Sequence, residues 1–128
     1  MPTFAMPKQI QTMKRLLTKS ETNLMNVLWD MPEGQGHGTE IVKKYPDPKP
    51  ALTTVLTFLK ILENKGYVTS RRVGRSNMFI PLVSKDDYRK AFLSSTKDDI
   101  FDGTYIGIAK FLLDQGLVTP DEVKALMQ

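Results

Sequence analysis

The sequence contains no cysteine and only one histidine, His37. Without cysteine the chain cannot form disulfides, thiolate nucleophiles or iron-sulfur clusters, and one imidazole does not make a metal centre. The paired aspartates at 86–87 and 98–99 are typical of helix starts, and they lack the accompanying polar groups that acid-base catalysis requires. We therefore expect no enzymatic activity, no metal site and no cofactor.

Long apolar runs are also absent. The longest run, at 78–83, has six residues and includes Pro81, whereas a membrane-spanning helix needs about 20 residues. Residues 1–16 carry three basic side chains but no apolar block of the kind found in signal peptides. We therefore expect a cytoplasmic protein.

Charge is unevenly distributed along the chain. Residues 1–83 contain 12 Lys and Arg against 6 Asp and Glu, a net charge of +6, whereas residues 84–128 contain 6 against 8, a net charge of −2. The excess is concentrated between Lys60 and Arg75, where five basic residues accompany one acidic residue. A basic segment joined to a weakly acidic one is typical of proteins in which one part contacts a polyanion.

Apolar spacing and helix-start residues predict a mainly α-helical chain with a small β-hairpin. Thr18 and Glu21 form a capping box ahead of an apolar helical pattern, and Thr119 begins another. Turn-forming residues make 32–38 a loop, and Gly74 marks the turn of the hairpin. The predicted helices span about 19–30, 39–45, 50–65, from 84, 103–114 and from 119, and the predicted strands span 67–73 and 77–82.

The segment 50–65 has the strongest helical pattern. At about 100° per residue, four apolar side chains fall on one side of the helix and four polar side chains on the other. The apolar side comprises Leu52, Val55, Leu59 and Leu62, and the polar side comprises Thr53, Thr57, Lys60 and Asn64. Two helices, a third helix with a free polar side and then a hairpin are the order of elements in a winged helix-turn-helix.

This order of elements predicts that the helix at 50–65 enters the major groove of double-stranded DNA while the hairpin contacts the phosphate backbone. Threonine offers a hydroxyl and a methyl group to base edges, and basic side chains neutralise phosphates. The expected base contacts are Thr53, Thr54 and Thr57, and the expected phosphate contacts are Lys60, Arg71, Arg72, Arg75 and Lys49. The alternative is that these residues form a solvated polar surface and that the fold is an adaptor for protein-protein contacts.

The chain resembles the penicillinase-repressor (BlaI/MecI) family from about residue 17 to its C-terminus. Only residues 1–16, which we treat as an N-terminal extension, lie outside the resemblance. It rests on short segments in matching order and spacing, namely LTKSE at 17–21, VLW at 27–29, TVLTFL at 54–59, LENKG at 62–66, GR at 74–75, PLVS at 81–84, FDG at 101–103 and LVTPDE at 117–122. The resemblance implies a winged helix-turn-helix DNA-binding domain at 17–83 and a helical dimerisation region at 84–128.

Membership of that family implies a homodimeric repressor on a palindromic operator, with genes for β-lactam resistance as one regulated class. A dimer is also expected because three short helices in about 45 residues cannot bury their own apolar faces. The expected dimer contacts are Tyr105, Ile106, Ala109, Leu112 and Leu113.

The resemblance further implies a membrane sensor-protease as the partner that ends repression by cleaving the repressor. Lys110 and Phe111 stand at the family's Asn-Phe cleavage position, so the Asn is replaced here. Leu56 is a second departure, because relatives place a longer polar side chain there, at the flank of the groove-facing surface. The operator sequence of a relative therefore cannot be transferred to this chain.

Overall fold

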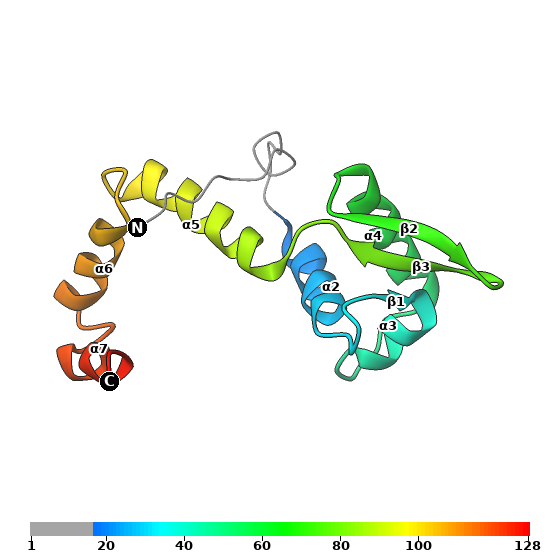
Figure 1. The fold of residues 1–128 in the computed structure, drawn as a ribbon, viewed down its shortest axis with the longest axis horizontal. Helices are drawn as coiled ribbons and strands as arrows, with labels where there is room; N and C mark the ends of the chain where they lie inside the picture. The colour runs from blue at the N-terminus through cyan, green and yellow to red at the C-terminus, as the bar shows by residue number, and fades with distance from the viewer. Residues whose placement is uncertain (1–16) are drawn as a thin grey trace. The chain divides into compact units, whose positions relative to one another are not determined.

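A computed structural model describes residues 17–128, so the predicted N-terminal extension at 1–16 lies outside the described residues (Figure 1). The chain divides into two compact units, one ending at Tyr88 and the other comprising Arg89–Gln128. The described helices are α2 (Lys19–Trp29), α3 (Gly38–Lys44), α4 (Leu52–Asn64), α5 (Lys85–Ile100), α6 (Tyr105–Asp114) and α7 (Pro120–Leu126), and the strands are β1 (Gly36–His37), β2 (Val68–Val73) and β3 (Ser76–Pro81). This mainly helical fold with a small antiparallel sheet confirms the predicted winged helix.

Helix α2 begins at the predicted capping box. Glu21 N donates to Thr18 Oγ1 at 3.2 Å, and Thr18 N donates to Glu21 Oε1 at 2.9 Å, so two backbone amides that lack helical partners are satisfied. Leu24, Met25 and Leu28 on one side of α2 are fully buried. Their spacing of three and four residues places them against the core of the first unit.

Helix α4 packs through the apolar side that its sequence predicts, with one exception. Val55, Leu59 and Leu62 are buried, together with Ile41 of α3. Leu52 was expected to join them but is 38% exposed. It is the first residue of α4, and the core begins one turn further along the helix, at Val55.

The sheet has the strand order β1-β3-β2, and both pairings are antiparallel. Val73 pairs with Ser76, so Gly74 and Arg75 form a two-residue turn; the φ of Gly74 is +67°, which glycine adopts without steric cost. Strand β1 was missed by the sequence, which predicted a loop at 32–38. The strand exists because Gly36 pairs with Phe79 in β3.

Aromatic side chains attach the first turn of α5 to the first unit. The rings of Trp29 and Tyr67 lie 5.9 and 6.0 Å from the ring of Tyr88. Trp29 Nε1 donates to the carbonyl of Val83 at 2.8 Å, and Leu17 N donates to the Tyr88 hydroxyl at 3.1 Å. Burial raises the pKa of Tyr67 to about 12, so this hydroxyl stays protonated at physiological pH.

The second unit consists of the rest of α5 and of α6 and α7. Thr104 Oγ1 caps α6 by accepting from Gly107 N, and Thr119 forms the predicted capping box with Glu122 ahead of α7. No residue in the fully described stretch 92–128 is buried. Within residues 17–128, no helix is both long and apolar enough to cross a membrane.

Candidate nucleic-acid interface

The side of α4 that faces away from the core carries the three threonines predicted to contact bases. Thr53, Thr54 and Thr57 are all exposed. Thr57 Oγ1 donates to the carbonyl of Thr53 at 2.9 Å, so its hydroxyl proton is already used and the oxygen can only accept. The hydroxyl oxygen and methyl group of Thr57 are therefore the parts available to a ligand.

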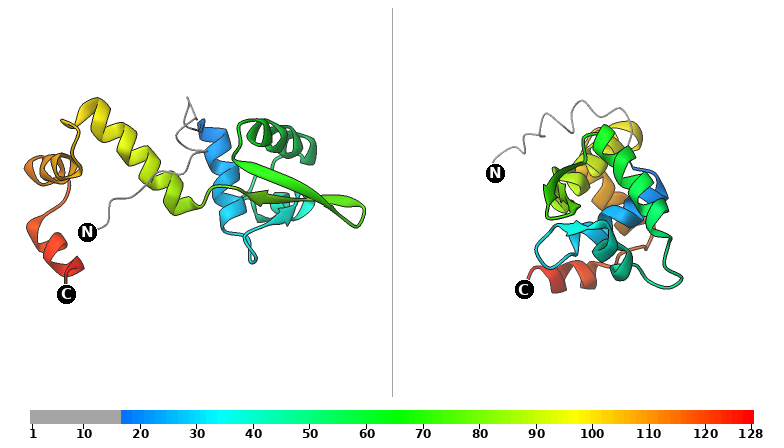
Figure 2. Two further views of the ribbon diagram at one scale, coloured as in Figure 1. Left: turned by 45° about the horizontal axis from the view of Figure 1, so that its top comes forward. Right: turned by 90° about the vertical axis from the view of Figure 1, so that its right-hand side faces the viewer.

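The hairpin of β2 and β3 extends past α3 and α4 at its turn (Figures 1 and 2). Arg71 pairs with Met78 and Arg72 pairs with Asn77. Because successive residues of a strand point to opposite faces, Arg72 shares a face with the buried Phe79, whereas Arg71 projects from the other face. The structure thus separates two arginines that the sequence grouped.

Arg72 and Arg75 are the two arginines best placed to contact the phosphate backbone of DNA. Arg72 lines a cleft together with α4 residues, and Arg75 occupies the hairpin turn. All three predicted arginines are exposed, and in the described part of the chain none of them lies within 4.0 Å of a carboxylate. Their charges are therefore available for an anionic partner.

The two lysines predicted to contact phosphate have different partners within the fold. Lys60 Nζ lies 3.7 Å from Glu63 Oε1, in a pair whose Lys60 side chain is 71% exposed, and such a pair is weak and readily exchanged. Lys49 Nζ instead donates to the carbonyls of Tyr45 at 2.6 Å and Lys43 at 3.0 Å. Lys49 therefore neutralises the negative C-terminal end of α3, which leaves less of its ammonium for phosphate.

Lys65 belongs to the basic segment but binds inside the fold. Its Nζ donates to Glu21 Oε1 at 2.9 Å and to Oε2 at 2.8 Å, and Glu21 is buried. Burial alone would raise the pKa of Glu21, but the hydrogen bonds from Lys65 and from Thr18 outweigh it and lower the pKa below its usual value of 4.5. The sequence identified Glu21 only as a capping residue, because Lys65 is 44 residues away in the chain.

His37 falls in the segment predicted as a loop, but it lies in β1 and is half-buried. Its Nδ1 lies 2.7 Å from Ser76 Oγ and 3.1 Å from the carbonyl of Asn77, and its backbone N donates to Glu40 Oε1 at 2.9 Å. His37 therefore connects the start of α3 to the first residues of β3, next to the turn of the hairpin. No group of three His, Asp or Glu side chains among the described residues could hold a metal ion.

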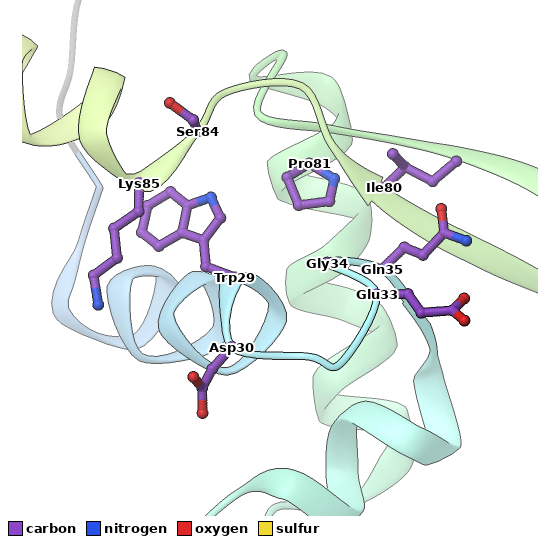
Figure 3. Close-up of a pocket in the computed structure, with 9 residues that line it drawn as sticks. All are labelled: Trp29, Asp30, Glu33, Gly34, Gln35, Ile80, Pro81, Ser84 and Lys85. Atoms are coloured by element: carbon purple, nitrogen blue, oxygen red, sulfur yellow. The ribbon is translucent and has the colours of Figure 1, made fainter.

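A separate pocket of about 410 Å³ lies between the end of α2, the loop that follows it, the end of β3 and the start of α5 (Figure 3). Its charged lining residues are Asp30, Glu33 and Lys85, and Figure 3 shows the two carboxylates directed away from one another. This excess of negative charge does not suit phosphate, and none of the residues predicted to contact DNA lines the pocket.

The second unit carries the residues predicted to form the dimer. At about 100° per residue, they fall within an arc of about 120° on α6. Tyr105, Ile106 and Leu113 are exposed, with Ile106 at 75%, and Ala109 and Leu112 are half-buried.

The predicted cleavage position lies inside helix α6. Lys110 is exposed and forms an ion pair with Asp114, and the ring of Phe111 packs edge-on against that of Phe101 at 5.5 Å. The bond between Lys110 and Phe111 is thus part of a regular helix. A protease that needs an extended substrate can reach it only after α6 unwinds.

Comparison with known proteins identifies one family. A family model described as penicillinase repressor matches residues 17–128. No curated protein matches the chain. The match extends over the threonine side of α4, the hairpin and the helices of the second unit.

Proposed function

Because the chain belongs to the penicillinase repressor family, we propose that this transcriptional repressor acts in the cytoplasm as a homodimer on a palindromic DNA operator. In this proposal α4 lies in the major groove and the hairpin lies along the phosphate backbone. Genes for antibiotic resistance, in particular β-lactam resistance, are the first regulated class to examine.

One observation carries the proposal: α4 buries its apolar side and leaves its threonine side accessible. Val55 and Leu59 are at most 1% exposed, whereas Thr53, Thr54 and Thr57 are exposed on the opposite side. Because the core packs against the other side, a duplex can contact the threonine side of α4 without any change in the fold. The basic side chains around it favour a polyanion as the partner.

Phosphate contact is assigned to the basic side chains that the fold leaves unpaired or weakly paired. Arg72 and Arg75 are the principal candidates, and Lys60 and Arg71 are the secondary ones. Lys49 is the weakest of the predicted set, because two main-chain carbonyls already accept from its ammonium. Neutralising phosphates releases counterions, so binding must weaken steeply as salt is raised.

Dimerisation is assigned to the exposed face of α6. Ile106 on this face is 75% exposed, and burying such apolar surface is favourable by about 25 cal/mol for each Å². A second copy of the chain can cover this face with matching surface, and two-fold symmetry is the usual arrangement. A dimer also supplies two copies of α4, as a palindromic operator requires.

The direct test is a mobility-shift assay with fragments of the source genome at low salt, followed by sequencing of the retained DNA. The proposal predicts retained fragments that share a palindromic sequence. If no fragment is retained at low salt, the proposal fails and the alternative function, an adaptor for protein-protein contacts, is favoured.

Relief of repression by a membrane sensor-protease is a separate part of the proposal. Cleavage between Lys110 and Phe111 would remove the last four residues of α6 and all of α7, and with them Leu112 and Leu113 of the surface assigned to the dimer. Mass spectrometry of the repressor from β-lactam-treated cells tests this step. An intact chain in derepressed cells would exclude cleavage while leaving operator binding untouched.

A further inference from the structure

Two leucines of α4 lie between its buried and its polar sides. Leu52 is 38% exposed and Leu56 is 40% exposed, whereas Val55, Leu59 and Leu62 on the same helix are at most 1% exposed. Leu52 and Leu56 are four residues apart, so they are neighbours on the helix surface. They form one apolar strip beside the threonines assigned to base contact.

The strip borders a cleft of about 210 Å³ between the first turn of α3, the N-terminal half of α4 and the hairpin. Phe79 supplies a further apolar wall, and Arg72 and Asn77 supply polar groups. The cleft is therefore apolar on the α4 side and carries a positive charge on the hairpin side.

Gly38 of α3 lies directly against these leucines. A Cβ at this position would be 2.9 Å from Leu56 Cδ2 and 3.3 Å from Leu52 Cδ1, and the first of these distances is shorter than any normal contact. The missing side chain lets both leucines pack against the backbone of α3. Each leucine is thus supported on one side by α3 and open on the other.

The major groove of DNA offers one strongly apolar group to such a strip, the C5-methyl group of thymine. Its other base-edge groups are mainly hydrogen-bond donors and acceptors, which leucine cannot satisfy. The phosphates that flank a thymine carry the charge that Arg72 complements. The cleft therefore combines an apolar contact for the base with a cation for the backbone beside it.

We propose that Leu52 and Leu56 contact the C5-methyl group of a thymine and thereby specify a T·A pair in each half of the operator. This inference rests on the proposed operator binding and adds to it the base that the leucines select. Leu56 is the principal contact, because it lies in the second turn of α4, beside Thr57.

The test replaces thymine by deoxyuridine at single positions of the selected operator, at constant salt, with the full-length protein. This change removes one methyl group and leaves every hydrogen-bonding group in place. At one thymine in each half-site we expect affinity to fall about fourfold, the effect of removing one methyl group from a buried contact. Equal binding to all thymine and deoxyuridine operators would overturn the inference, whereas the repressor function would stand.

Leu56→Ala shows whether this side chain makes the contact. We expect the variant to bind the thymine operator more weakly and to bind thymine and deoxyuridine operators equally. Ile61→Ala is the matched control, because Ile61 is also exposed on α4, at 37%, but does not line the cleft. It should retain the preference for thymine.

Undiminished discrimination by Leu56→Ala would overturn the assignment to Leu56. Because the deoxyuridine experiment uses the unmodified protein, it remains decisive even if the variant folds poorly. Failure to bind any duplex would instead contradict the proposed function itself.

Discussion

The ion pair between Glu21 and Lys65 is buried, so we expect its removal to lower the free energy of unfolding more than the removal of an exposed ion pair does. Lys65→Met keeps most of the apolar stem and removes the ammonium group. The Glu21 side chain is only 4% exposed, so its carboxylate would lose both hydrogen bonds from Lys65 without gaining water in exchange. The variant therefore holds an uncompensated charge in the first unit.

The expected cost follows from the burial of the two partners. Breaking a fully buried pair costs about 3–5 kcal/mol, and a hydrogen bond to a charged group contributes about 1.5–3 kcal/mol. The Lys65 side chain is 33% exposed, so water partly screens the pair and we expect about 2–3 kcal/mol. For a unit of this size that loss lowers Tm by about 10–20 °C.

The loss of unfolding free energy caused by Lys65→Met should depend on pH, and the direction of this dependence follows from the pKa of Glu21. The folded-state pKa of Glu21 lies below its usual value, so in the wild type this group contributes stability above the unfolded-state pKa and loses it as pH falls through the folded pKa. In Lys65→Met the burial of Glu21 is no longer offset by the hydrogen bonds from Lys65, so the pKa of Glu21 is higher than in the wild type. The difference in unfolding free energy between the two proteins should therefore shrink as pH is lowered from 7 towards 4.

Urea denaturation followed by tryptophan fluorescence measures the effect, because Trp29 is the only tryptophan and lies in the first unit. Lys60→Met is the matched control. It makes the same change five residues earlier, in α4, at a pair whose lysine is 71% exposed, and should cost at most about 1 kcal/mol. In Glu21→Gln/Lys65→Met no charge is buried, so stability should partly recover. Equal losses for the two lysine variants, or a gap that widens in acid, would refute the reasoning.

The remaining predictions concern binding and assembly. Arg75→Ala should weaken binding to all duplexes and reduce the slope of log affinity against log salt by about one unit; an unchanged slope would remove Arg75 from the phosphate contacts. Thr57→Val keeps the shape but removes the hydroxyl, so competition assays should show altered preference among operators, and equal losses on operator and random DNA would contradict base contact. Ile106→Asp places a charge in the assigned dimer face and should shift the protein to monomer in sedimentation experiments, with the helical circular dichroism retained. Gly38→Ala should displace Leu56 and reduce the preference for thymine over deoxyuridine, because its Cβ meets Leu56 Cδ2 at 2.9 Å.

Local interactions in the sequence were sufficient to predict most of the fold. The capping boxes at Thr18 and Thr119, the turn at Gly74 and the apolar spacing of α4 all involve residues within four positions of one another. Interactions over so short a distance form whenever the local geometry is adopted, so their pattern can be recognised in the chain itself. The same periodicity placed Thr53 and Thr57 on the free side of α4.

Tertiary packing decided what the sequence could not. Strand β1 has two residues and forms only because β3, about 40 residues later, supplies its hydrogen-bond partners. Lys65 was counted among the basic residues of the DNA-binding part, yet it binds Glu21 of another helix, and Lys49 binds carbonyls at the end of α3. Whether a charged side chain contacts solvent or another residue depends on which distant segments the fold brings beside it. The spacing of residues in the sequence does not predict these contacts.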